Sequence, residues 1–416
     1  MFGTNSIYTV HPHIFTNREG GVMMRLQLTT TTLICITITT MFTLYVYNET
    51  QGGLHEEFIR YYTEWTQYRI QLMVDPEIGL SSRIEPYARK AYAHQSFHAI
   101  IKLGPQVVPY IFAIGDIELI PAVEKICKVH VHRQFIRDPV VIPGKDVQIT
   151  FEEFPEILTE LRNWRWGKEW LLWWLEGEKR TPKWFTNRYG KWLAAKQQGN
   201  AQEAQAMYQR LLNIGIAAIP FWLEKLQSEQ DQSIKEEIIK ALSYLTDGEI
   251  KLNMSPQDCL DWWKANKERW TIPFPRSKRE FLKWLEREGW EEPRLAVPCV
   301  ITVSRLEDEE AIDALLRFLR HPISLVRGAS LERIMILFGE QLPKEYALGV
   351  RTDEWERVGD LMEIGKYDWV RKRVMKAKNQ IEDKTVADKI AKELSDWWKE
   401  NKGRVKIYWQ RAWENL

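Results

Sequence analysis

The chain has 416 residues, long enough for about two or three domains, and its 58 Lys and Arg nearly balance 57 Asp and Glu. The net charge of +1 gives no global field to draw in nucleic acid, so no nucleic-acid partner is expected. The four cysteines form no C-x-x-C pair, which argues against a zinc framework or a disulfide scaffold. The 20 tryptophans are the one unusual feature of the composition.

The N-terminal region divides into a polar and an uncharged part. Residues 1–24 are polar and aperiodic, which is typical of a disordered segment. The stretch from Leu26 to Tyr47 carries no charge and, at ~1.5 Å per residue, would reach roughly 33 Å as a helix. A hydrocarbon core is ~30 Å thick, so we predict a transmembrane signal anchor at 25–47.

The flanks of this stretch set its orientation. Arg25 precedes it and Glu49 follows it, which by the positive-inside rule places the N-terminus in the cytoplasm and the body outside. No A-x-A site follows, so an uncleaved anchor is preferred to a removed signal peptide. A buried β-strand is the alternative, because I-C-I-T-I-T alternates; the length and the flanks favour the membrane. Met1, Met23 and Met24 remain alternative starts.

The body begins with a helix predicted at Leu54–Met73 and another from Pro86 to Leu103, ended by Gly104. A pattern then recurs as L-G-P-Q-V-V-P-Y-I at 103–111 and I-G-I-A-A-I-P-F-W at 214–222, with a looser copy, P-R-L-A-V-P-C-V, at 293–300. In each copy a helix breaker is followed by a proline that suits the first turn of a new helix. Such recurrence indicates an array of helical hairpins.

The region between the first two copies departs from this pattern. V-H-V-H alternates from Val129, so an extended loop or hairpin insertion is predicted at 129–150. Helices rich in tryptophan are predicted at 151–200, with a new helix starting at Thr181-Pro182. Insertions on one face of an array often carry binding function.

A short string occurs twice. Ser255-Pro256 is a helix start, and its helix carries D-W-W-K-A-N-K at 261–267, which returns as D-W-W-K-E-N-K at 396–402. Two strings that differ at one position indicate internal duplication, so each of two blocks, 54–270 and 271–416, is expected to close with such a helix. Because an active site is seldom needed twice, a packing role is favoured for these tryptophans.

One stretch of the second block predicts two helices that must pack together. His321-Pro322 separates them, because proline is tolerated in a first turn and not in a helix interior. The first helix has its apolar side chains in one stripe at Ile312, Leu315, Leu316 and Leu319.

This pair resembles a HEAT-type repeat. The residues that carry the resemblance are Pro322, Val326-Arg327, Ala329 and a ladder of Leu331, Ile334 and Leu337. The resemblance implies that the proline opens the second helix and that Arg327 braces the turn. It also implies an armadillo-type α-solenoid.

Histidines supply the only hints of a metal site. His94 and His98 are four residues apart on a predicted helix, and His130 and His132 would share a face of a strand. A metal-dependent enzyme would need the two pairs to converge. No G-x-S-x-G, P-loop or G-x-G-x-x-G is present, so no catalytic residue, metal or cofactor is predicted.

We therefore expect an all-α array of HEAT-like helical hairpins behind a single N-terminal transmembrane helix. The expected function is a non-catalytic scaffold or adaptor that binds another protein outside the cytoplasm. The alternatives are an extracytoplasmic module that binds glycan or cell-wall material by tryptophan stacking, and the metal-dependent enzyme. The residues expected to bind the partner are Trp164, Trp166, Trp173, Trp184, Trp262 and Trp397.

Overall fold

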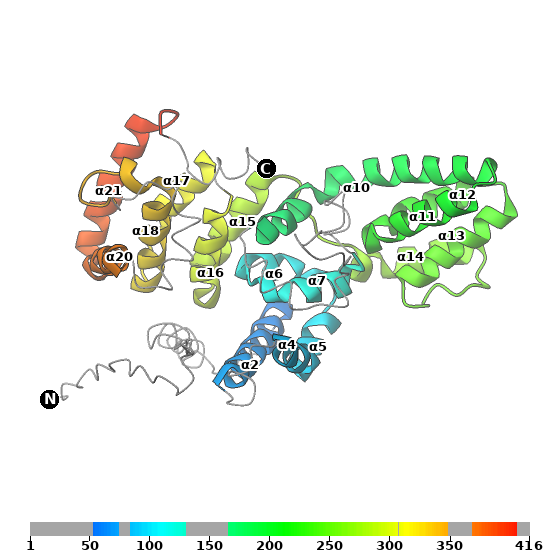
Figure 1. Cartoon of the computed structure of the whole chain (residues 1–416), viewed down its shortest axis with the longest axis horizontal. Coiled ribbons are helices and arrows are strands. Elements are labelled where there is room, and N and C mark those ends of the chain that lie inside the picture. Colours follow the sequence, from blue (N-terminus) through cyan, green and yellow to red (C-terminus); the bar gives the residue numbers. More distant parts are fainter. Residues whose placement is uncertain (1–52, 75–83, 130–164, 307, 348–367, 406–416) are drawn as a thin grey trace, which may run out of the picture. The chain divides into compact units, whose positions relative to one another are not determined.

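The computed structural model describes residues 53–74, 84–129, 165–306, 308–347 and 368–405 (Figure 1). Within these ranges the regular elements are all helices and no strand occurs, which confirms the all-α prediction. The predicted disordered segment at 1–24, the anchor at 25–47 and all but Val129 of the insertion at 129–150 lie outside the described residues.

No single helix of the described ranges is long and apolar enough to cross a membrane. Gln95–Lys102 and Pro105–Ile114 meet that criterion only when taken together, across a bend of 99°.

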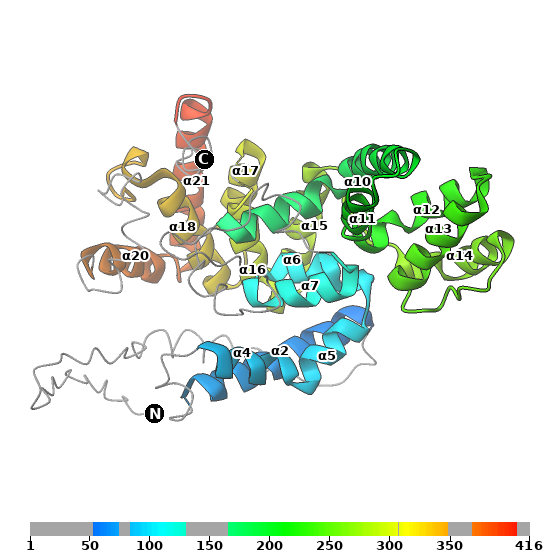
Figure 2. The same ribbon diagram turned by 45° about the vertical axis from the view of Figure 1, so that its right-hand side comes forward.

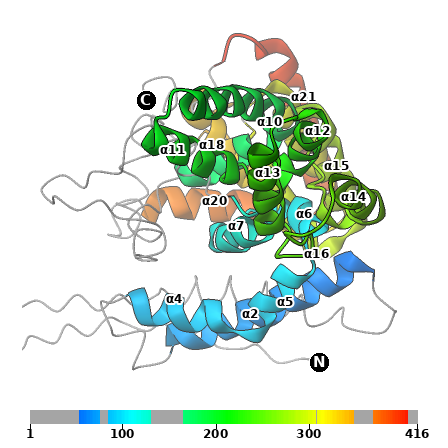
Figure 3. The same cartoon turned by 90° about the vertical axis from the view of Figure 1, so that its right-hand side faces the viewer.

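The first three helices of the described chain, α2, α4 and α5, lie side by side (Figure 3). Helix α2, Leu54–Val74, follows the prediction and buries Phe58, Trp65 and Leu72. The single helix predicted from Pro86 to Leu103 is wrong, because the chain forms α4, Ile84–Ala93, and α5, Gln95–Lys102. His94 separates them: its backbone is extended and its Nδ1 accepts a hydrogen bond from the Ser96 N–H, which caps α5.

The recurring start pattern has one local structure in its first two copies. Gly104 and Gly215 have φ of 77° and 76°, which favours glycine. A 3-10 turn, η1 (Pro105–Val107), follows Gly104, and another, η3 (Gly215–Ala218), begins at Gly215 itself. The next helix, α6 (Val108–Ile114) or α12 (Ile219–Ser228), then has its proline in the first turn. Proline fits there because its missing N–H would have no partner within the helix.

The same pattern also occurs before α7, where it was not predicted, and is absent at Pro298, where it was predicted. Gly115 has φ of 64° and precedes η2, Ile117–Leu119, and α7, Ile120–Cys127, whose Pro121 lies in the first turn. In the looser copy no new helix begins at Pro298, since α16 runs unbroken over Pro293–Ser304. That part of the prediction is wrong.

The tryptophan-rich region is one helix where it is described. Helix α10, Arg165–Gln197, continues through Pro182, so the start predicted at Thr181-Pro182 is wrong. An interior proline costs ~3 kcal/mol or more. Burial of Trp170 and Trp174 before the proline and of Trp192 after it offsets this cost, because each large apolar side chain contributes roughly 2–3 kcal/mol. Helix α11, Ala201–Leu212, packs along α10.

The four helices after α12 come from both predicted blocks, α13 and α14 from 54–270 and α15 and α16 from 271–416. Helix α13 spans Gln232–Leu245, α14 spans Pro256–Trp270 and α15 spans Lys278–Glu291. The predicted start of α14 is confirmed: Ser255 and Asp258 each accept a hydrogen bond from the other's backbone N–H. Helix α16 packs on α6 (Figure 2), where the Thr302 hydroxyl lies 2.9 Å from the carbonyl oxygen of Ala113.

The C-terminal part contains the hairpin that the sequence predicts. Helix α17, Glu309–Phe318, packs on α18, Ser324–Phe338. The 3-10 turn η4, Gly339–Gln341, follows α18. Helices α20, Asp368–Gln380, and α21, Lys384–Asn401, complete the described chain. The predicted stripe is buried at Ile312, Leu315, Leu316 and Leu319.

The Arg327 side chain braces the turn between α17 and α18. It is 2% exposed and donates to the carbonyls of His321 at 2.9 Å and Pro322 at 2.7 Å. It also donates to the carbonyls of Ile381 at 3.0 Å and Glu382 at 2.5 Å, between α20 and α21. One guanidinium therefore holds two turns together.

We expect Arg327→Met to lower the free energy of unfolding by about 3 kcal/mol, because four carbonyls, two of them in buried hydrogen bonds, lose their donor. Denaturant unfolding followed by circular dichroism measures the change. Arg320→Met, at an exposed position just before the same turn, is the matched control and should be near neutral. Equal stability of the two variants would contradict the bracing role.

Candidate functional site

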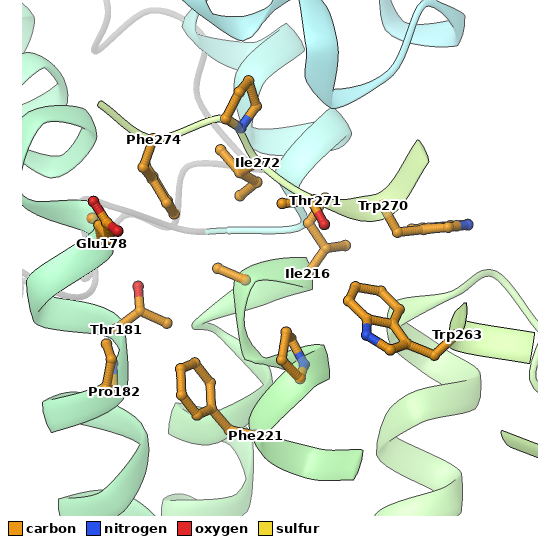
Figure 4. Close-up of a pocket in the computed structure, with 14 residues that line it drawn as sticks. Glu178, Thr181, Pro182, Ile216, Phe221, Trp263, Trp270, Thr271, Ile272 and Phe274 are labelled. Carbon is orange, nitrogen blue, oxygen red and sulfur yellow. The ribbon is translucent and has the colours of Figure 1, made fainter. Parts of the chain in front are cut away.

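A pocket of about 360 Å³ lies between α10, η3, α12, the end of α14 and the segment that follows it (Figure 4). Its deepest residues are buried, and Glu178, Pro220 and Thr271 are exposed at its edge. The residues that line it are Gly177, Glu178, Thr181, Pro182, Ile216, Ala217, Pro220, Phe221, Trp263, Trp270, Thr271, Ile272, Pro273 and Phe274.

The segment Thr271–Phe274 forms one wall because α14 ends at Trp270. The backbone of Thr271 is extended, and Pro273 disfavours the helical conformation at Ile272 directly before it. The side-chain amide of Gln106 donates to the carbonyls of Glu268 at 2.7 Å and Thr271 at 3.3 Å. These bonds join the end of α14 to the turn that precedes α6.

A close approach of glycine to an aromatic ring joins this wall to α10. A Cβ atom added to Gly177 would lie 2.2 Å from the Phe274 ring, so only glycine leaves room. Behind this contact, the rings of Trp173 and Trp174 lie 5.4 and 5.5 Å from that of Phe274. The packing of the tryptophans on α10 thus fixes the wall of the pocket.

Polar and aromatic side chains lie on different sides of the pocket. Figure 4 shows Glu178 and Thr181 on the side opposite Trp263 and Trp270. Among the described residues that line the pocket, Glu178 is the only charged one. Pro182 has no N–H to donate to the carbonyl of Glu178, four residues earlier. Hydrogen-bond acceptors therefore gather on the α10 side, and aromatic faces on the other.

Several tryptophans expected to bind a partner lie elsewhere. Trp164 is outside the described residues, and of Trp166 only the backbone, in α10, is described. Trp173 is 3% exposed and belongs to the core. Trp184 is half-buried beneath the guanidinium groups of Arg180 and Arg188, 4.5 and 4.8 Å from its ring centre.

The other two expected residues belong to the duplicated string. Trp262 is half-buried beside Trp263 and Trp270 without lining the pocket, and Trp397 packs on Phe338 at 5.2 Å. The sequence analysis missed Trp263 and Trp270. Their spacing of seven residues places them on one helix face, and this was the signal that could have found them.

The two copies of the string share their internal bonds and differ in their surroundings. The Asn266 amide donates to the Trp262 carbonyl at 2.8 Å, and the Asn401 amide to the Trp397 carbonyl at 2.7 Å. In the second copy, Trp398 is buried and its Nε1 donates to Asp313 at 2.8 Å. The corresponding Trp263 lines the pocket instead.

The metal-dependent alternative requires the two histidine pairs to converge, which the described residues do not test. His94 caps α5 and His98 is exposed, while His130 and His132 lie outside the described residues. Metal-ligand side chains of the described residues do meet at His55, Glu56 and Glu292.

An arginine occupies the position of a cation in that group. Arg294 donates to Glu56 at 2.5 Å and to the two carboxylate oxygens of Glu292 at 2.7 and 2.9 Å. The guanidinium thus supplies the positive charge that a metal would bring. We interpret the group as an ion pair between α2 and the start of α16.

A partly buried ion network joins α2, α4 and the α6–α7 turn. Arg69 lies 2.6 Å from Asp116 and 2.9 Å from Glu118, while Tyr62 and Tyr87 donate to these carboxylates at 3.0 and 3.1 Å. Burial acts to raise the pKa of Asp116, yet the charge and hydrogen bonds of Arg69 hold that pKa below its usual value. Burial, with the charge of Glu118, raises the pKa of Tyr87 to about 12.

Comparisons of the chain with protein-family models, with curated proteins and with solved structures find no match.

We expect Gly177→Ala to lower the free energy of unfolding by about 1–3 kcal/mol, because the methyl group collides with the Phe274 ring. Gly190→Ala is the matched control on the same helix, where an added Cβ meets nothing within 4 Å. It should stabilise the chain by about 0.5–1 kcal/mol through helix propensity. Thermal or denaturant unfolding measures both, and the same sign for both would refute the close approach.

We expect Asp116→Asn to destabilise the chain by about 3–5 kcal/mol near pH 7, because Arg69 loses a buried charge partner. Since the folded-state pKa of Asp116 is lowered, its contribution is present above the unfolded pKa and lost as pH falls through the folded one. The stability difference between parent and variant should therefore shrink below about pH 4. Denaturant unfolding at several pH values tests this.

Asp388→Asn, at an exposed helix position, is the control. It should have little effect at any pH. A stability difference for Asp116→Asn that stays constant down to pH 2 would contradict the buried ion pair.

Proposed function

We propose that the chain is a non-catalytic helical scaffold that binds a partner protein through the pocket between α10, α12 and α14. The observation that carries this proposal is the lining itself: concave, largely apolar and aromatic, with few polar groups. Binding sites commonly have this character. Half-buried tryptophans such as Trp263 and Trp270 are typical anchors for a partner.

The polar groups of the pocket suit binding better than catalysis. Among the residues that line it, one carboxylate, at Glu178, and two hydroxyls, at Thr181 and Thr271, are the polar side chains besides the two indoles. Nucleophilic catalysis needs an activated nucleophile, commonly beside a base, and acid–base catalysis needs a side chain placed to donate or accept a proton, most often a histidine. The lining offers neither a histidine nor a cysteine for that task.

The helices are proposed to form a HEAT-like array. Two features support this interpretation: the glycine, 3-10 turn and proline that recur before α6, α7 and α12, and the Arg327 brace after Pro322. Units of an array bury one another and leave extended faces on which partners bind.

The proposed scaffold is held at a membrane by residues 25–47, with the N-terminus in the cytoplasm and the body outside it. The uncharged length of this stretch and the Arg25 and Glu49 flanks support the proposal. The pocket would then meet partners of the same compartment.

A glycan site has less support than a protein site. Glycan binding by stacking needs exposed aromatic faces. Five tryptophans are among the largest fully buried side chains of the described residues, so these five cannot stack on a glycan: Trp65, Trp170, Trp174, Trp192 and Trp222.

Photo-crosslinking of the full-length chain in its native host tests the proposal. We expect a benzoylphenylalanine in place of Trp263 to give discrete protein adducts, identified by mass spectrometry. The same replacement at Trp290, which is 43% exposed on α15 and does not line the pocket, is the matched control and should give none of these adducts. Identical adducts at both positions, polysaccharide adducts alone, or no adduct would overturn the proposal.

A further inference from the structure

The acceptor-rich side of the pocket points to the chemistry of its occupant, and this inference rests on the proposed function. We propose that the partner inserts a lysine or arginine side chain, carried by an extended peptide segment, into the pocket. The cation lies between the acceptors of α10 and the aromatic faces of α12 and α14.

Charge complementarity is the first argument. Among the described residues that line the pocket, Glu178 brings the only charge, and it is negative. Pro182, Pro220 and Pro273 contribute no N–H donors, and Pro182 leaves the carbonyl of Glu178 without its usual helical donor. A ligand rich in donors and positively charged satisfies these acceptors. An anionic ligand would meet the carboxylate.

The aromatic side of the pocket supplies the second argument. The faces of tryptophan and phenylalanine attract cations. This chain already uses that contact: Arg180 and Arg188 lie over Trp184, and Lys196 lies 5.3 Å from the ring centre of Trp192.

Trp263 differs from these rings. In the described part of the chain the cation that contacts a pocket ring is Arg269, 5.6 Å from the ring centre of Trp270. Arg269 is not part of the lining and pairs with Glu249. None of the described cations lies over Trp263, so this ring is available to a cation from a partner.

The size of the pocket limits what the partner inserts. A volume of 360 Å³ is near the lower end of the range for small-ligand sites. A helix with its side chains is ~10–12 Å across and exceeds such a space. One long side chain with its adjoining backbone is the element of matching size. Its methylene groups would contact Ile216 and Phe221, while its charged end reaches Glu178.

Fluorine NMR of the full-length chain labelled with fluorotryptophan tests the inference. Trp263→Phe and Trp270→Phe assign the two pocket signals. The probes are the acetylated and amidated pentapeptides Ala-Ala-Lys-Ala-Ala and its norleucine counterpart, which keeps the apolar stem and lacks the charge. We expect saturable shifts of the Trp263 signal with the lysine peptide, and about fivefold weaker binding of the norleucine peptide.

Variants that remove one negative charge show which residue causes the preference for the lysine peptide over the norleucine peptide. Glu178→Gln should abolish the advantage of lysine over norleucine without unfolding the chain, because this side chain is exposed. Glu236→Gln removes one charge from an exposed position on α13 that is not part of the lining, and should keep the advantage.

The outcomes separate this inference from the proposed function. Equal binding of the two peptides, an advantage that survives Glu178→Gln, or no shift with lysine would overturn the cationic occupant. In each of these cases, protein adducts from crosslinking at position 263 would still support the proposed function. If crosslinking fails while the lysine peptide binds with the expected preference, the pocket recognises cations and the scaffold function is the part that fails.

Discussion

Every helix leaves carbonyl groups without donors at its C-terminal end, and in this chain long side chains from other helices supply the missing donors. Arg327 donates to four carbonyls in two turns, and Gln106 to two carbonyls at the end of α14. Arg305 donates to the carbonyl of Gly115 at 2.8 Å. These bonds connect turns and helix ends that lie far apart in the chain, 54 residues for Arg327 and Ile381, 162 for Gln106 and Glu268 and 190 for Arg305 and Gly115.

The pocket follows from this constraint. Gln106 holds the end of α14, and the close approach of Phe274 to Gly177 holds the segment beyond it. Between these two points the chain is not helical, and the Phe274 N–H bonds back to the Ile272 carbonyl at 2.8 Å, so the segment does not fill the space beside η3 as a helix would. The pocket is thus the space left where α14 ends against α10, and its shape depends on the contact between Gly177 and Phe274 within the lining and on Gln106 outside it.

The sequence predicts local features of this fold well and long-range ones poorly. The Ser255 cap and the prolines that open α6 and α12 follow from rules that act within a few residues, whereas the expectation that Arg327 braces its turn came from the resemblance to a HEAT-type repeat. The sequence analysis failed at His94 and Pro182, because a cap and the burial of tryptophans on both sides overrode the local pattern. The pocket and the Asp116 network unite residues far apart in the chain, and periodicity carries no information on such convergence.

The duplicated string shows how two copies of one helix become unequal. Both keep the bond from asparagine to the carbonyl of the first tryptophan, so the copies are alike in the helix itself. Trp398 is enclosed and bonded to Asp313, whereas Trp263 has one side open to the pocket. Replacement of the Trp398 ring would therefore remove a packed side chain and a hydrogen bond, whereas replacement of the Trp263 ring would mainly change the wall of the pocket.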